Sequence, residues 1–162
     1  MDKIEIIPGQ TDRAIAIMGE TARFYRERGF RIWPEEWLTR EQLVTAEARP
    51  GDFCIGQVEG EDACAFILQR RDSQYWSGAA QGEAVYLHKF CVRPDFSHRG
   101  MTQSVVEALR ALCRDQGIRY IRLDTGLDEK AVRKIYLRAG FKIVDIIDYD
   151  NGRSLALYEL EV

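Results

Sequence analysis

Hydrophobic positions recur along this chain with two different periods, and the switches between them mark the expected elements. Apolar or alternating runs predict strands at residues 4–7, 53–58, 63–69, 85–92, 120–124, 141–147 and 154–160. Apolar residues at helical spacing predict helices at residues 11–26, 101–116 and 128–139, and a shorter helix that opens at Thr39 and runs through Ala46. Such an order of helices and strands is typical of an α+β or α/β protein.

Turn-forming residues separate these elements. Glu59–Asp62 joins the second and third strands and Asp150–Gly152 joins the last two, so both pairs are expected to form antiparallel hairpins. Arg70–Gly82 is polar and contains glycine, which predicts a loop before the central strand. Gly117 and Gly140 follow two long helices and are expected to end them.

The composition fits one domain over residues 1–162. With 46% apolar and 30% charged residues, a chain of 162 residues can bury one good core but has no room for a second domain. The net charge is -3 and the basic residues are scattered, which argues against a nucleic-acid-binding surface. No apolar run is long enough to cross a bilayer, and residues 1–7 carry acidic side chains where a signal peptide would be basic. We therefore expect a cytoplasmic protein without a membrane partner.

Cysteine and histidine are the candidate metal ligands. The cysteines form no CxxC pair and are Cys54, Cys64, Cys91 and Cys113. The first three fall in apolar strands, where a thiol behaves as a small buried hydrophobic group. His88 and His98 lie ten residues apart on different elements and make no short ligand cluster. The sequence therefore predicts no disulfide and no metal.

The most specific signal is the segment from Val92 to Thr102, VRPDFSHRGMT, which ends a strand and opens a helix. The free N–H groups at such a helix N-terminus form a site for an anion, here a diphosphate. The segment resembles the acetyl-CoA motif V-x-P-x-x-[QR]-x-x-G-x-[GA] of the GCN5-related N-acetyltransferases (GNAT). Tyr136–Phe141 is similar to the second family motif, Y-x-x-x-G-F, and with the element order the resemblance covers nearly the whole chain.

Two positions depart from the first motif. Ser97 stands where the family has Gln or Arg, and Thr102 stands where it has Gly or Ala. Because backbone N–H groups make most of the contacts in such a loop, these changes put the affinity for the coenzyme in doubt more than they do the fold. Taken alone, the loop also fits an ordinary strand-to-helix connection with Gly100 as its turn.

The resemblance implies a fold and a coenzyme site. The expected architecture is a mixed, mostly antiparallel sheet of six to seven strands, flanked by about four helices, with a cleft where the fourth and fifth strands splay apart. Pantetheine of acetyl-CoA would lie in this cleft against backbone groups of Phe90, Cys91 and Val92. The diphosphate would bind to the loop residues Ser97, His98, Arg99, Gly100, Met101 and Thr102.

The resemblance also implies chemistry: an amine attacks the thioester directly. Tyr136 would protonate the departing thiolate, although a tyrosine that only fills the core explains it too. His88 is the sharper candidate base, because Tyr86–Val92 is similar to the catalytic strand of arylalkylamine N-acetyltransferases and imidazole exchanges protons near neutral pH. A histidine hydrogen-bonded inside the sheet is the alternative.

Three further sequence expectations concern the same region. Period-two alternation predicts that Tyr86, His88 and Phe90 share one face of their strand. Glu83 is a fallback base that fits a solvated loop residue better. Asp128 and Glu129, near the position where many relatives carry Asn, are expected to cap the last helix.

Aromatic residues crowd the segments that wall the acceptor side of this fold. The set comprises Phe24, Tyr25, Phe30, Trp33, Trp37, Tyr75 and Trp76. We assign acceptor binding to Tyr25, Phe30, Trp33, Trp76 and Tyr86. They suit an aryl or alkyl amine or a peptide, and half of such residues would be packing in any case.

The sequence reading is thus an acetyl-CoA-dependent N-acetyltransferase that acts on a primary amine, either a small molecule or a protein Lys or N-terminal amine. Acetyl-CoA is its co-substrate. A module of the same fold that binds acyl-CoA or a regulatory partner without catalysis is the alternative, because of Ser97 and Thr102. A homodimer through the last hairpin is common in relatives and stays open.

Overall fold

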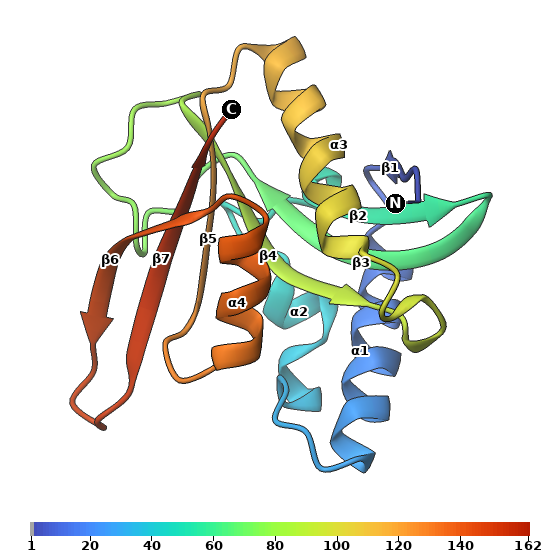
Figure 1. Cartoon of the computed structure of the whole chain (residues 1–162). Helices are drawn as coiled ribbons and strands as arrows, with labels where there is room; N and C mark the ends of the chain where they lie inside the picture. Colours follow the sequence, from blue (N-terminus) through green and yellow to red (C-terminus); the bar gives the residue numbers. More distant parts are fainter. Residues whose placement is uncertain (1) are drawn as a thin grey trace.

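A computed structural model describes residues 2–162 and contains one seven-stranded sheet in the order β1-β2-β3-β4-β5-β7-β6 (Figure 1). The strands are β1 (Glu5–Ile7), β2 (Phe53–Val58), β3 (Glu61–Gln69), β4 (Ala84–Val92), β5 (Tyr120–Gly126), β6 (Lys142–Asp148) and β7 (Ser154–Glu161). Both predicted hairpins form and are antiparallel. The mixed, mostly antiparallel sheet predicted from the sequence is confirmed.

The pairing between strands is short at the centre of the sheet, between β4 and β5. β4 and β5 are the parallel pair, and their register covers only Ala84–Tyr86 against Tyr120–Arg122. Beyond these residues the two strands diverge, while β5 continues to pair with β7 as far as Gly126. Backbone groups on the β5 side of β4 are therefore without a strand partner over the second half of that strand. This is the splay that the sequence reading expected.

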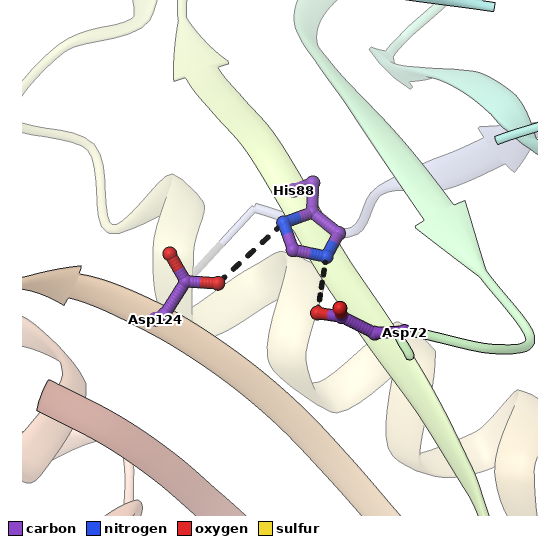
Figure 2. A group of neighbouring side chains, drawn as sticks. All are labelled: Asp72, His88 and Asp124. Carbon is purple, nitrogen blue, oxygen red and sulfur yellow. Dashed lines mark hydrogen bonds and ion pairs between the residues drawn. The ribbon is translucent and has the colours of Figure 1, made fainter. Parts of the chain in front are cut away.

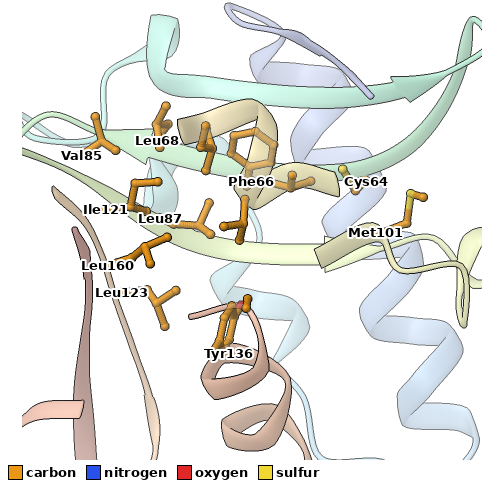
Figure 3. Packing of buried hydrophobic residues seen from close by; sticks show 14 of the residues in the cluster. Cys64, Phe66, Leu68, Val85, Leu87, Met101, Ile121, Leu123, Tyr136 and Leu160 are labelled. Carbon is orange, nitrogen blue, oxygen red and sulfur yellow. The ribbon is translucent and has the colours of Figure 1, made fainter. Parts of the chain in front are cut away.

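Two layers of helix cover the sheet. The main helices are α1 (Thr11–Glu27), α2 (Arg40–Leu43), α3 (Met101–Gln116) and α4 (Lys130–Arg138). The apolar face of α3, which includes Val105 and Leu109, lies in the same core as the α4 residue Tyr136, on one face of the sheet. Figure 3 shows this core, with Met101 of α3 and Tyr136 labelled. Residues of α1, such as Met18, form a second core on the other face. None of the helices between residues 2 and 162 is long and apolar enough to cross a membrane.

Helix ends follow local chemistry closely. α3 ends at Gly117, which adopts φ 68 and whose N–H bonds the Arg114 carbonyl, as expected for a left-handed C-cap. Thr39 caps α2 through its hydroxyl, which accepts a hydrogen bond from the Gln42 N–H at 3.2 Å. The helix nevertheless ends at Leu43 rather than Ala46, because Val44 is already extended.

A bulge in β4 overturns one expectation. Lys89 has φ 51, in the left-handed region, and the register with β3 shifts between Ala65 and Ile67. The extra residue reverses the alternation. Phe90 consequently packs edge-on against Phe66 in the α3-side core, while His88 lies on the α1 side. The prediction that Phe90 shares a face with His88 was wrong.

Candidate active site

His88 lies at the point where β4 and β5 diverge, held by a carboxylate from the preceding loop. Its Nε2 lies 3.0 Å from Oδ2 of Asp72, whose side chain is only 6% exposed (Figure 2). The other Asp72 oxygen accepts a hydrogen bond from the Tyr75 N–H, and the Asp72 carbonyl accepts one from the Trp76 N–H. Because an ionised carboxylate oxygen can only accept, this contact places an imidazole hydrogen on Nε2, and in the neutral ring the lone pair then lies on Nδ1.

The free ring nitrogen faces a second carboxylate across the splay. Nδ1 of His88 lies 3.7 Å from Oδ2 of Asp124 on β5 (Figure 2). This Asp124 oxygen is buried and has no hydrogen-bond partner in the described part of the chain. Burial raises the pKa of Asp124 above its ordinary value, against the opposing pull of His88. A buried carboxylate oxygen without a partner is stabilised when a hydrogen-bond donor binds to it.

Sequence reasoning missed this cluster, because its members come from a loop and two strands. The ligating atoms of Asp72, His88 and Asp124 all lie within 4.8 Å of one another. The two carboxylates meet opposite nitrogens of one ring, as Figure 2 shows, rather than turning with it toward one common point. The arrangement therefore fits the holding and passing of a proton better than the convergent ligand set of a metal.

Glu83, the fallback base, is committed elsewhere. Its carboxylate lies 2.8 Å from the guanidinium of Arg122, and this hydrogen bond lowers the pKa of Glu83. Arg122 also bonds Glu159 at 2.9 Å and the Tyr86 hydroxyl at 3.1 Å. A carboxylate paired in this way is a poor proton acceptor. The structure favours His88 over Glu83 as the candidate base.

The predicted acceptor-side aromatics divide into three places. Trp33 lies under the ammonium group of Lys89, with 5.6 Å between Nζ and the ring centroid. Trp76 stacks on Arg122 and lies close to Tyr86, which is buried. Tyr25 packs edge-on against the exposed Phe30 near the end of α1. Of the five, Trp33 is the one that contacts the bulge residue next to His88.

The Ser97–Thr102 loop presents backbone donors at the start of α3, apart from the Ser97 N–H, which bonds the Pro94 carbonyl at 3.1 Å. Gly100 adopts φ 71 and His98 adopts φ 60, and no side chain caps the helix. The first intrahelical bond runs from the Ser104 N–H to the Gly100 carbonyl, so the preceding N–H groups have no partner within the helix. Two left-handed residues beside a free helix N-terminus form a concave set of donors suited to phosphate.

Side chains of this loop are partly engaged. The Ser97 hydroxyl donates to the Pro94 carbonyl at 2.7 Å. Arg99 pairs with Asp2 at 3.0 Å and lies over the Phe96 ring. Both side chains thus bond within the protein, and the effect of Ser97 on coenzyme affinity stays a prediction.

Tyr136 is buried where α4 meets the end of the sheet. Its ring packs against Phe141 at 5.7 Å and Tyr158 at 5.9 Å between centroids. Burial raises the pKa of Tyr136, which keeps its hydroxyl protonated. This burial and ring packing are those of a core tyrosine, and the role of Tyr136 as a proton donor stays a prediction.

The cap expected at the start of α4 does not form as predicted. Glu129 occupies the N-cap position but makes no side-chain cap bond, and its carboxylate instead accepts from the Gly126 N–H at 2.9 Å. Asp128 faces Arg31 at 3.7 Å. Glu129 thus bonds the end of β5 and Asp128 pairs with the loop after α1, and neither side chain caps the helix.

All four cysteines are unpaired and buried. Burial raises the pKa of Cys91 to about 12, so its thiol stays protonated beside the candidate site. Cys91 is therefore poorly suited to act as a thiolate nucleophile. Any contact of Cys91 with the coenzyme would therefore come from its backbone groups rather than from its sulfur.

Comparison with known proteins agrees with this geometry. The sequence model of the acetyltransferase (GNAT) family matches residues 19–141, so the chain belongs to this family. An uncharacterized N-acetyltransferase of Methanocaldococcus jannaschii is 22% identical over 132 residues, which cover 82% of this chain and 54% of that protein. The chain thus spans about half the length of that relative.

Solved structures share the fold. A GNAT family acetyltransferase from Listeria monocytogenes superposes with a TM-score of 0.74 at 22% identity, covering 98% of this chain and 95% of that one. A GNAT family acetyltransferase from Elizabethkingia anophelis, solved with acetyl-CoA bound, gives a TM-score of 0.68 at 15% identity and covers 100% of both chains. At such identities the likeness establishes the architecture.

Proposed function

We propose that this protein is an acetyl-CoA-dependent N-acetyltransferase that transfers the acetyl group directly to a primary amine. The observation that carries the proposal is the position of His88: it is held by Asp72 and faces Asp124, where β4 and β5 diverge. A proton-accepting nitrogen at that place is what attack by an amine on a thioester requires. Membership of the acetyltransferase family supports the same reaction.

The coenzyme site would use mainly backbone. The N–H groups of His98–Thr102 would bind the diphosphate, because the Ser97 N–H already donates to the Pro94 carbonyl at 3.1 Å. The unpaired edge of β4 at Phe90–Val92 would bind the pantetheine arm. Acetyl-CoA supplies the thioester that is broken. The neighbour solved with acetyl-CoA supports this assignment at the level of the fold.

His88 and Asp124 would prepare the acceptor. An alkyl amine is mostly protonated at neutral pH, because its pKa is about 10. The buried Asp124 oxygen would attract the ammonium group, and the Nδ1 lone pair of His88 would take its proton. Asp72 would hold the ring in the required tautomer by accepting from Nε2.

Two further groups would serve the transition state. An N–H of the β4 segment Phe90–Val92 would donate to the oxygen of the thioester carbonyl as negative charge develops on it. The Tyr136 hydroxyl, kept protonated by burial, would give a proton to the leaving thiolate. A thiol has a pKa of about 8.5, so this last step is expected to add modestly to the rate.

Calorimetry with acetyl-CoA, followed by thiol-release assays over a panel of amines, tests the proposal. We expect binding, and release of coenzyme A that depends on the amine. The Tyr136→Phe variant should keep coenzyme affinity and lose kcat, whereas unchanged turnover on an identified substrate would remove its role. Failure of acetyl-CoA to bind at millimolar concentration would overturn the transferase proposal altogether.

The rival is an acyl-CoA-binding module without catalysis. Thr102 is the reason to consider this alternative, because its side chain stands where the family motif has a small residue. Coenzyme binding without thiol release on any amine would favour the module. The same panel separates a small amine from a protein Lys or N-terminal amine.

Other parts of the proposal rest on the sequence. We treat residues 1–162 as one catalytic domain, without a metal and located in the cytoplasm. Four buried, unpaired cysteines are compatible with a reducing compartment. A homodimer through the β6–β7 hairpin stays an open alternative, which sedimentation would decide.

A further inference from the structure

Lys89 is the residue at the β4 bulge, and neither the reaction nor the fold accounts for its charge. A left-handed φ of 51 costs a side-chain-bearing residue energy that the surrounding sheet has to supply. The Lys89 side chain lies on the α1 side of the sheet, where its ammonium group is over the ring of Trp33. Strained backbone of this kind clusters at binding sites.

The ammonium group of Lys89 lacks a close anionic partner. Its Nζ lies over the Trp33 ring, and no carboxylate of residues 2–162 forms a hydrogen bond with it. Burial lowers the pKa of Lys89, while Asp124 acts on it only through space and in the opposite direction. A half-buried cation in this state would be stabilised by an anion brought in by a ligand.

Charges of both signs therefore lie near one another on the α1 face of the sheet. Asp124 offers a buried, unpartnered carboxylate oxygen beside His88, and Lys89 offers an ammonium group on the same face of the diverging strands. A plain alkyl ammonium ion would be attracted by the first and repelled by the second. A molecule that carries an amine and a carboxylate close together would satisfy both.

We propose that Lys89 binds the carboxylate of the acceptor, and that the acceptor is a free amino acid or a similar amine with a neighbouring anionic group. The proposal rests on the proposed function, because it places the amine of that acceptor at His88 and Asp124. Trp33 would form the apolar floor under the charged end. A peptide N-terminus or a protein lysine, which lacks an adjacent carboxylate, would fit the same site poorly.

The test compares each of the twenty amino acids with its own carboxamide, first by calorimetric titration in the presence of coenzyme A and then by thiol release. The best amino acid should bind about tenfold or more tightly than its amide, since a charge-assisted contact is lost in the amide. Lys89→Met should abolish this preference while leaving coenzyme affinity unchanged. Lys89→Arg should retain part of it, and Lys142→Met, a matched change at an exposed β6 position, should retain all of it.

Either result is decisive. If no amino acid binds better than its amide, or if Lys89→Met leaves the preference intact, the inference is wrong. If Lys89→Met weakens coenzyme binding instead, Lys89 belongs to the coenzyme site and the inference is equally wrong. Binding that discriminates without any thiol release would uphold the anion site and remove the transferase function, so the two failures are distinguishable.

Discussion

The two faces of β4 and β5 differ more than any other adjoining regions of this protein. On the α3 side, Val85, Leu87 and Leu123 pack into one apolar core (Figure 3). On the α1 side, the residues that alternate with them include His88 and Asp124. The same strands thus supply cohesion on one face and charge on the other, because successive side chains point in opposite directions.

This contrast teaches where stability and chemistry reside. Apolar burial needs no particular partner, so side chains on the α3 face stay packed where the pairing of β4 with β5 ends after Tyr86. Polar groups on the α1 face need specific partners, and the diverging strands leave some of them without one. Substitutions on opposite faces at neighbouring positions should therefore separate catalysis from folding.

The largest effect is expected for His88→Ala. Loss of a general base should reduce kcat by about 100-fold to 10,000-fold, while acetyl-CoA affinity stays close to that of the wild type. The pH-rate profile of the variant should differ from that of the wild type, because the base that accepts the proton of the amine is gone. An unaltered pH-rate profile would rule out His88 as the base.

Leu87→Ala, one residue away on the opposite face, should do the reverse. Leu87 is 4% exposed and lies in the α3-side core, so its truncation should lower the free energy of unfolding by about 2–5 kcal/mol. Denaturant titration measures this, and kcat per folded molecule should be retained. Leu137→Ala, at an exposed α4 position, is the matched control. Equal destabilisation by both changes would contradict the contrast.

Asp72→Asn should have an intermediate effect on rate. The amide cannot stabilise the protonated ring as a carboxylate does, so we expect kcat to fall about tenfold with little change in KM or coenzyme affinity. Asp72→Glu should recover part of the loss. A variant with full activity would show that Asp72 only anchors its loop.

Asp124→Asn should weaken binding of the acceptor ammonium group, and its effect on stability should be the smallest of the effects predicted here. Burial raises the pKa of Asp124 in the folded protein, so the folded state holds a proton at pH values where the unfolded chain has released it. Stability is therefore lost as pH rises through the folded-state pKa, and the penalty is absent below about pH 4, where both states are protonated. His88 and Lys89 oppose this penalty and Asp72 adds to it.

The variant should accordingly melt a few degrees higher than the wild type at neutral pH, and the difference should shrink in acid. Scanning calorimetry across pH measures it. Asp115→Asn, at an exposed α3 position, should show no such dependence. A lower melting temperature for Asp124→Asn at neutral pH would mean that its contact with His88 outweighs the burial.

Much of the molecule follows from the sequence alone. The periods of apolar residues predicted seven strands and four helices, and Gly117 predicted the end of α3, because these features depend on residues near one another in the chain. The GNAT motif and the position of Tyr136 could be identified from the sequence for the same reason, and the family match confirms the resemblance to this family. The candidate base His88 was found through its strand motif.

Only the tertiary structure decided what surrounds His88. Asp72 lies 16 residues before it and Asp124 on another strand, and no local spacing joins a loop to two diverging strands. The bulge at Lys89, which moved Phe90 to the other face, depends on pairing with β3. Partners distant in sequence meet only when the sheet forms, and they set which charges are paired and which are left for a ligand.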